Sequence, residues 1–212
     1  MLEGSEEAFR PQEAKAEVAG AAFALLGNMV TPLPVSFVAG VVGSWRVESI
    51  AAVCGESLPM AARLQVIDGA EARPDASVWR LDGFTGELRY TTGTERQALV
   101  AVQASLGRRE ATCAALIPIR KNAAWWNLAQ DERRAIFEER SRHIAIGHDY
   151  LPAVARRLHH CRGLGGPFDF LTWFEFAPEA KPAFDAMLKR LRDTEEWCYV
   201  GREVDIRLVR EQ

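Results

Sequence analysis

The sequence predicts an α+β fold built from two halves, each with helices covering one side of a largely antiparallel sheet. Short segments rich in β-branched and aromatic residues recur along the chain, and segments with helical periodicity fall between them. The chain has 212 residues, of which 48% are hydrophobic, so it can form one sizeable core or two small halves packed together. The order of the predicted elements favours two halves.

Residues 1–34 are expected to be an N-terminal extension, partly disordered, that lies outside the main fold. Residues 18–35 are mostly small and apolar, but glycines and prolines interrupt them, so a membrane-spanning helix is not expected. Glutamates precede this run, which is the wrong charge for a signal peptide. We therefore expect no association with a membrane.

Residues 35–110 are predicted to form a reduced N-terminal half. β-Branched residues with glycines among them indicate bent strands, Asp82-Gly83 is a turn signal, and the spacing of Leu99 and its apolar neighbours indicates a helix. The predicted elements are one or two strands over residues 37–53, a hairpin of residues 78–81 and 88–92, and a helix over residues 94–106 that ends at Gly107.

Residues 111–212 are predicted to form the more complete C-terminal half. Its third strand is bulky at successive positions, so both faces of that strand should be covered. The predicted strands are residues 111–119, 155–164, 168–176 and 197–209, and the predicted helices are residues 131–150 and 178–192. This order of elements predicts a ferredoxin-like unit in each half, although no repeat is visible in the sequence itself.

Charge and cysteine content narrow the class of protein. The formal net charge of −3 argues against a nucleic-acid partner, because binding phosphates requires a basic face. The four cysteines lack paired spacing, which is typical of reduced thiols in a cytoplasmic protein.

The four histidines all lie within residues 140–161, but their spacing disfavours a zinc site. His159 and His160 precede Cys161 on a predicted strand, so their side chains alternate between opposite faces. His143 and His148 are separated by about 500° on a helix and therefore do not share a stripe. These residues cannot all converge on one ion.

His143 lies on the apolar side of its predicted helix, and Gly147 one turn later leaves an open patch beside the imidazole. Two interpretations stay open on this pattern alone. The commoner one is a buried histidine hydrogen-bonded to a neighbour. The other is an imidazole beside a slot for a flat group, which is what a proximal haem ligand requires. Trp125 and Trp126 after Lys121 suit either a core or the wall of such a slot.

Three longer segments carry a specific resemblance: RKNAAWW at 120–126, RHIAIGHDYLPAVARRLHHCRGLGGPFDFLTWFEF at 142–176, and LRDTEEWCYVGREVDIRL at 191–208. Weaker similarity extends back to residue 37 and includes CGESL and LVAVQASLGR. In this order the segments resemble the chlorite dismutase family of haem proteins, specifically its short, dimeric branch. The resemblance covers most of the chain.

The resemblance implies a haem b in the C-terminal half. It makes His143 the proximal iron ligand and Glu196 the acid that hydrogen-bonds its imidazole, with Glu195 as a near neighbour that could do the same. Lys121 is implied near a haem propionate. Trp125 and Trp126 are implied as haem contacts.

On the distal side, the resemblance makes Arg156 the arginine above the iron and Gln103 a glutamine close to it. The implied enzyme is a homodimer that converts chlorite to chloride and molecular oxygen. A haem peroxidase, a coproheme decarboxylase and a haem-binding protein without turnover remain alternatives. The decarboxylase branch typically carries glutamine where this chain has Arg156, which counts against it.

Overall fold

The computed structural model describes residues 32–69, 77–85 and 90–211. The chain divides into two compact units, Met1–Thr31 and Pro32–Gln212, and all the described residues belong to the second. The expected extension, residues 1–34, therefore lies almost wholly outside the described residues. The first described strand already begins at Pro34.

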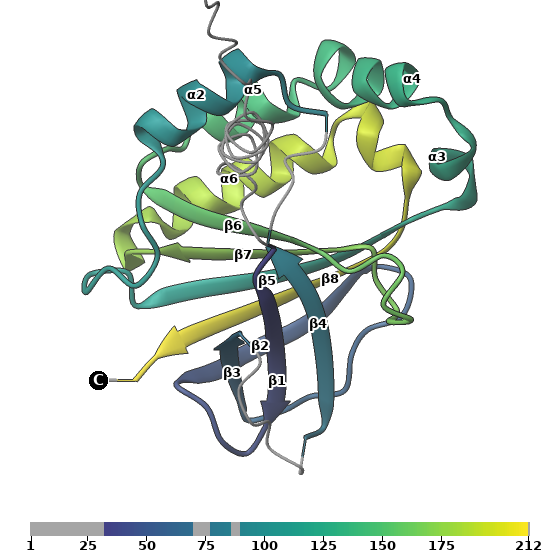
Figure 1. Cartoon of the computed structure of the whole chain (residues 1–212). Coiled ribbons are helices and arrows are strands. Elements are labelled where there is room, and N and C mark those ends of the chain that lie inside the picture. Colours follow the sequence, from purple (N-terminus) through teal and green to yellow (C-terminus); the bar gives the residue numbers. More distant parts are fainter. Residues whose placement is uncertain (1–31, 70–76, 86–89, 212) are drawn as a thin grey trace, which may run out of the picture. The chain divides into compact units, whose positions relative to one another are not determined.

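The strands of the second unit form one closed barrel in which all neighbouring strands are antiparallel (Figure 1). The strands are β1 (Pro34–Gly40), β2 (Trp45–Cys54), β3 (Arg63–Asp68), β4 (Trp79–Thr85), β5 (Cys113–Lys121), β6 (Val154–His160), β7 (Phe170–Phe176) and β8 (Val200–Arg210). Their order around the barrel is β1-β3-β2-β8-β5-β7-β6-β4. The predicted α+β class with antiparallel strands is confirmed.

Each half of the chain contributes four neighbouring strands to this barrel. The order is β4-β1-β3-β2 in the first half and β8-β5-β7-β6 in the second, so the two orders are the same when strands are counted within each half. The halves join where β2 pairs with β8 and where β4 pairs with β6. They therefore share one closed sheet instead of forming two separate ones.

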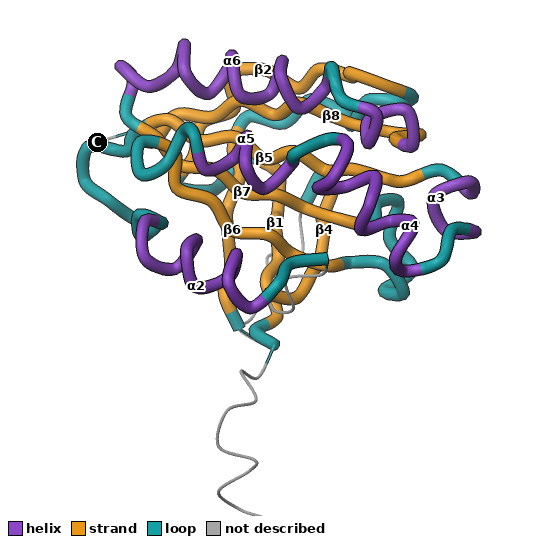
Figure 2. Tube along the Cα trace, turned by 90° about the horizontal axis from the view of Figure 1, so that it is seen from above, coloured by secondary structure: helices purple, strands orange, loops and turns teal. Residues whose placement is uncertain are grey.

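The helices lie over the strands of the second half, as Figures 1 and 2 both show. They are α2 (Gly93–Val102), α3 (Ala123–Asn127), α4 (Gln130–Arg134), the π-helix η1 (Ala135–Arg140), α5 (His143–His148), α6 (Lys181–Arg192) and the 3-10 helices η2 (Pro178–Ala180) and η3 (Glu195–Tyr199). In the described part of the chain, no helix is long and apolar enough to span a bilayer.

Two hydrophobic clusters lie on opposite faces of the second-half strands. Leu116 and Trp173 face each other across β5 and β7 and point into the barrel interior. Ile117 and Phe174 point to the other face and pack against α6. All four are buried, because the barrel interior covers one face of the sheet and the helices cover the other. The expectation that residues 168–176 are covered on both faces is confirmed.

The hairpin predicted around Asp82-Gly83 is wrong, because β4 runs straight through both residues. Asp82 pairs with Ser36 of β1, and its carboxylate accepts a 2.6 Å hydrogen bond from the serine hydroxyl. A Cβ added at Gly83 would lie 2.9 Å from the Cβ of His159. The glycine is needed for close packing of β4 against β6, not for a turn.

The single helix predicted over residues 131–150 is also wrong, because it is broken into α4, η1 and α5. Arg142 has a left-handed conformation with φ of 53°, and α5 begins at the next residue. The carboxylate of Glu138 accepts hydrogen bonds from the main-chain nitrogens of Ile144 (2.6 Å) and Ala145 (3.3 Å) and so caps the new helix. The break lets α5 start in a new direction with His143 in its first turn.

Glu95 fixes the start of α2 and ties it to the following helices. Its carboxylate accepts a 2.7 Å hydrogen bond from the main-chain nitrogen of Thr92, which completes a capping box. Arg134 donates to the same carboxylate at 2.6 and 3.0 Å. The hydrogen bonds of Arg134 lower the pKa of Glu95 to about 2.

We expect Glu95→Gln to lower the free energy of unfolding by about 1 kcal/mol at pH 7, because a charged pair becomes a neutral one. The pKa of Glu95 is depressed in the folded state, so its contribution is present above about pH 4.5 and is lost as the pH falls towards 2. Urea unfolding of both proteins should show a smaller difference at pH 3 than at pH 7. Glu110→Gln, at an exposed carboxylate, is the control. A difference independent of pH would contradict this role.

Candidate functional site

A cavity lies between the helix-covered face of the second-half strands and the helices above it. Its empty volume, including the part open to solvent, is about 1030 Å³. Most of its wall is apolar: Ile117, Ile119, Phe137, Ile144, Leu158, Phe170, Phe174, Met187, Leu188, Leu191 and Trp197. The ionisable side chains in this wall include His143, Arg156 and Glu196.

His143 presents one face of its imidazole to this cavity. Its Nδ1 lies 2.6 Å from Oε2 of Glu196, and since that carboxylate accepts, Nδ1 carries the proton and Nε2 has a free lone pair. Among the described residues, Nε2 has no hydrogen-bond partner. A Cβ at Gly147 would meet no atom within 4 Å, so the space beside the ring is open. Glu196 thus orients the imidazole through Nδ1, and Nε2 is available to bind a metal.

Glu196 is buried and engaged by three groups. Besides His143, its Oε1 lies 2.8 Å from Nζ of Lys121, and its main-chain nitrogen donates to the hydroxyl of Ser141 at 2.9 Å. Burial alone would raise the pKa of this carboxyl, but its interactions with His143 and Lys121 outweigh burial and lower the pKa to about 2. Glu195 points elsewhere and pairs with Arg140 at 3.0 Å. Glu196 is therefore the ionised carboxylate that contacts the imidazole.

Lys121 is almost fully buried, and its ammonium group is directed at Glu196. It donates to both a side-chain and a main-chain oxygen of that residue, at 2.8 and 3.3 Å. The same nitrogen lies 4.5 Å from the ring centre of Trp125 and 5.7 Å from that of Trp197. In this structure the ammonium group of Lys121 forms an ion pair with the carboxylate of Glu196. A contact between Lys121 and a haem propionate stays a prediction.

Arg156 on β6 lines the same cavity. Its guanidinium group makes no hydrogen bond or ion pair with any part of the chain that the structure describes. Burial lowers the pKa of Arg156. The next residue, Arg157, instead pairs with Asp68 through two hydrogen bonds of 2.7 and 3.0 Å. A secluded cation without a protein partner is suited to binding an anion.

Gln103 and Trp126 do not belong to the cavity wall. Gln103 is exposed at the end of α2, and its amide donates a 2.8 Å hydrogen bond to the main-chain oxygen of Arg156. Trp126 stacks on the outer side of a wall residue, Phe170, at 6.2 Å, with the guanidinium of Arg162 3.4 Å from its ring centre. Neither residue lines the cavity. Gln103 contacts the wall residue Arg156, and Trp126 contacts the wall residue Phe170.

Two aromatic rings of the wall were not foreseen from any pattern in the sequence. The ring of Phe137 lies 4.4 Å from that of His143 at an interplanar angle of 23°. The ring of Trp197 lies 6.3 Å from the imidazole at 18°. Trp197 directly follows Glu196, so its proximity could have been inferred, whereas Phe137 is placed by the π-helix that the periodicity did not show.

Comparisons with known proteins identify the family of this chain. Residues 72–211 match the family model described as chlorite dismutase. The chain belongs to the chlorite dismutase family. A solved dimeric chlorite dismutase from Nitrobacter winogradskyi is 54% identical, with a TM-score of 0.78, over 84% of this chain and 99% of that one.

More distant members of the family share the fold. A variant chlorite dismutase from Candidatus Nitrospira defluvii is 18% identical and has a TM-score of 0.57, over 84% of this chain and 91% of its own. The curated chlorite dismutase from Ideonella dechloratans is 40% identical over 60 residues, which is 28% of this chain and 20% of that protein. The chain thus matches only about a fifth of the length of this curated relative.

Proposed function

We propose that this chain is a haem b enzyme that converts chlorite to chloride and molecular oxygen. The observation that carries the proposal is the pairing of two unengaged groups in one apolar cavity, Nε2 of His143 and the guanidinium of Arg156. The first is a ligand for an iron centre and the second is a receptor for a small anion. The names of the related proteins point to the same reaction.

The residues of the cavity fit a haem. Gly147 leaves room for a flat group beside the imidazole, and the apolar wall suits a macrocycle. Trp125 is buried in that wall, and its Nε1 donor has no acceptor among the described residues, as if it were meant for an acceptor on a bound group. A haem has carboxylates at its edge that could accept this hydrogen bond. No C-x-x-C-H motif is present, so the attachment is non-covalent.

The second half of the chain, residues 111–212, supplies most of the wall of this site, and Tyr90 and Thr91 of the first half complete it. The elements of the second half follow the order strand, helices, strand, strand, helix, strand, with the sheet order β8-β5-β7-β6, which supports a ferredoxin-like unit. Residues 35–110 have the same strand order, and their described part has no helix between its strands, which supports a reduced copy. Four free cysteines in the described part are compatible with a cytoplasmic protein.

When bound, the haem iron would supply the oxidation–reduction chemistry that breaks a Cl–O bond of chlorite and joins the two oxygens. The chain must then attract the anion, hold the hypochlorite that leaves, and keep it in the cavity until it recombines. Arg156 suits both tasks, because its planar guanidinium is permanently charged and donates parallel hydrogen bonds. The apolar wall around it limits competing protons and reductants.

Glu196 and Lys121 act on the opposite side. An ionised carboxylate on the Nδ1 proton makes the imidazole a stronger donor to iron and favours its oxidised state. The ammonium of Lys121 keeps that carboxylate ionised in spite of its burial. The triad of His143, Glu196 and Lys121 therefore sets the basicity of the ligand without contacting the substrate.

We expect Glu196→Gln to retain haem while raising the ferric/ferrous reduction potential, because glutamine weakens the charge on the imidazole. Spectroelectrochemical titration of the holoprotein measures this shift. Glu195→Gln is the matched control, since Glu195 is adjacent in sequence but pairs with Arg140 on the surface. Equal potentials in wild type and Glu196→Gln would refute the tuning role.

Oxygen release tests the proposed reaction. Purified protein loaded with haem should evolve oxygen when chlorite is added in an oxygen electrode, and apoprotein should not. A holoprotein that oxidises a phenol with hydrogen peroxide but releases no oxygen from chlorite would be a peroxidase. A holoprotein with neither activity would be a haem-binding protein. Either result would replace the proposed function.

We also expect a homodimer. Beyond Val47, β2 pairs among the described strands only with β8, and most of residues 48–54 are exposed, although six of the seven are apolar or small. A long apolar strand with one free edge is normally covered by a partner. The related Nitrobacter protein is dimeric.

Light scattering should give twice the chain mass of 23.6 kDa. Val53→Glu, on the exposed part of β2, should shift the protein towards a monomer because it places a charge in an apolar contact. Val41→Glu, at an exposed residue in the connection before β2, is the control and should stay dimeric. A monomer or pentamer mass for the wild type would remove this prediction.

A further inference from the structure

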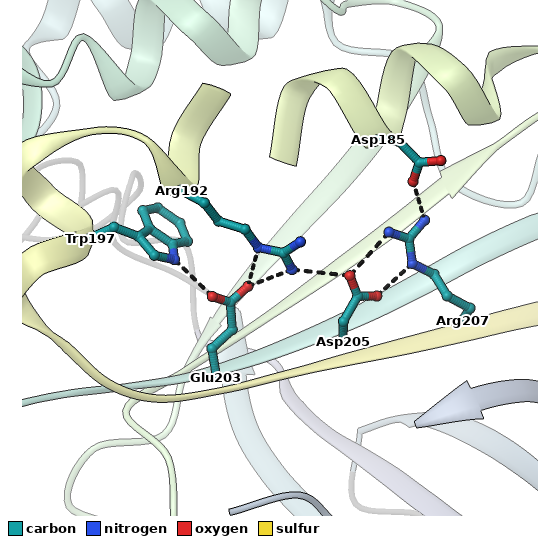
Figure 3. Close-up of polar contacts among 6 residues, drawn as sticks. All are labelled: Asp185, Arg192, Trp197, Glu203, Asp205 and Arg207. Atoms are coloured by element: carbon teal, nitrogen blue, oxygen red, sulfur yellow. Dashed lines mark hydrogen bonds and ion pairs between the residues drawn. The ribbon is translucent and has the colours of Figure 1, made fainter. Parts of the chain in front are cut away.

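A row of alternating charges lies where α6 covers β8 (Figure 3). Asp185 of α6 accepts a 2.7 Å hydrogen bond from Arg207 of β8, and Arg207 donates in turn to Asp205. Arg192, at the end of α6, donates to Asp205 at 3.0 Å and to Glu203 at 2.9 and 2.7 Å. The row begins at an exposed residue and ends deep in the fold.

The inner end of the row contacts the cavity wall. The second carboxylate oxygen of Glu203 accepts a 2.7 Å hydrogen bond from Nε1 of Trp197, as Figure 3 shows. Trp197 lines the cavity, and its ring is nearly parallel to the imidazole of His143. The indole of Trp125 in the same wall has no acceptor in the described chain. Trp197 is thus the anchored indole of the two.

A carboxylate in this position needs its own support. Glu203 is fully buried, and a buried carboxylate is costly unless other groups pair with it. Burial alone would lower the pKa of Arg192, but its hydrogen bonds and charge contacts with Glu203 and Asp205 raise it, so Arg192 stays charged. Each oxygen of Glu203 is therefore occupied, one by Arg192 and the other by the indole.

We infer that Glu203 is a positioning residue that fixes Trp197 against the proximal imidazole and, through that ring, adjusts the haem iron. A carboxylate on the indole N–H makes the ring richer in electrons, and an electron-rich ring beside the imidazole favours the more positive, oxidised state of the metal. This inference rests on the proposed function, because it requires His143 to bind haem iron. Glu203 would then be a second residue, besides Glu196, that adjusts the reduction potential of the iron from the proximal side.

The contact itself is tested without haem. In apoprotein labelled with nitrogen-15 at its indoles, the Trp197 Nε1–H signal is identified by its loss in Trp197→Phe. Glu203→Gln keeps the size and an acceptor oxygen, but its weaker hydrogen bond should shift this proton signal upfield. Asp185→Asn, at the exposed end of the row, should leave it in place. An unchanged signal in Glu203→Gln would overturn the anchoring role.

The effect on the iron is tested in holoprotein by a double-mutant cycle. Glu203→Gln should raise the ferric/ferrous potential by less than Glu196→Gln does, and the same change in a Trp197→Phe background should have little further effect. Equal shifts in the two backgrounds, or no shift in either, would overturn the inference, because Glu203 would then not act through the indole. Failure of the wild type to bind haem would instead overturn the proposed function, and the indole signal would still report the contact.

Discussion

His143→Ala is expected to lose haem, with an affinity at least roughly 100-fold below that of the wild type. Removing an outer partner of a metal ligand typically costs about 10–100-fold in affinity, and removing the ligand itself should cost more. The variant should still fold, because His143 belongs to the cavity wall and to neither hydrophobic cluster, and Lys121 still pairs with Glu196. Haem titration followed by absorbance measures the loss.

His148→Ala is the matched control for this experiment. His148 lies at the other end of α5 and is not part of the cavity wall. It should bind haem as the wild type does, with the same ferric spectrum. If His143→Ala keeps a normal haem content and an unchanged spectrum, His143 is not the iron ligand and the site lies elsewhere.

Arg156→Ala is expected to bind haem but to release less oxygen per chlorite and to bleach in fewer turnovers. Without the guanidinium, hypochlorite should leave the cavity before it recombines, and the free hypochlorite should attack the haem. Fluoride or cyanide should also dissociate faster from the ferric protein, because a charged donor is lost. The free energy of unfolding should change little, because the side chain of Arg156 makes no hydrogen bond or ion pair in the described chain.

Arg157→Ala separates this effect from a general loss of positive charge. Arg157 is the next residue on β6 but pairs with Asp68. It should lose some stability and keep its oxygen yield. Turnover number, oxygen yield and trapped hypochlorite are compared in the three proteins. Equal yields and equal bleaching in Arg156→Ala and wild type would rule out the distal role.

The local elements of the second half could be predicted from sequence because their composition and spacing are strong. The strands β5, β7 and β8 and helix α6 fall close to the predicted ranges. Closure of the barrel could not be predicted, because β2 pairs with β8 and β4 with β6 across large separations in sequence that leave no local pattern. β3 (Arg63–Asp68) was missed because it is short and half of its residues are polar.

The two elements that were predicted wrongly show that one sequence pattern can be compatible with more than one structure. Gly83 follows an aspartate and therefore looks like a turn, but its small size serves the contact with His159. Residues 131–150 keep a helical periodicity, yet the left-handed Arg142 and the cap supplied by Glu138 break the helix. Tertiary contacts decide both cases, and the sequence pattern does not contain them.

Much of the candidate site was accessible from sequence through the family resemblance. The structure brings His143, Glu196, Lys121, Trp125 and Arg156 to one cavity. It places Gln103 and Trp126 behind that wall, in contact with wall residues. This could not be predicted, because position in sequence does not determine which side chains point into a cavity. The partner of Lys121 could not be foreseen either, since a buried lysine finds its counter-ion only in the folded chain.

The central claim is that both oxygens of one chlorite are joined inside this cavity before hypochlorite escapes. A mixture of chlorite doubly labelled with oxygen-18 and unlabelled chlorite, given to the holoprotein in ordinary water, tests this claim most directly. Mass spectrometry of the gas should show doubly labelled and unlabelled oxygen and little mixed oxygen. Mixed oxygen in statistical proportion would mean that hypochlorite leaves and returns, and no oxygen at all would contradict the proposed reaction.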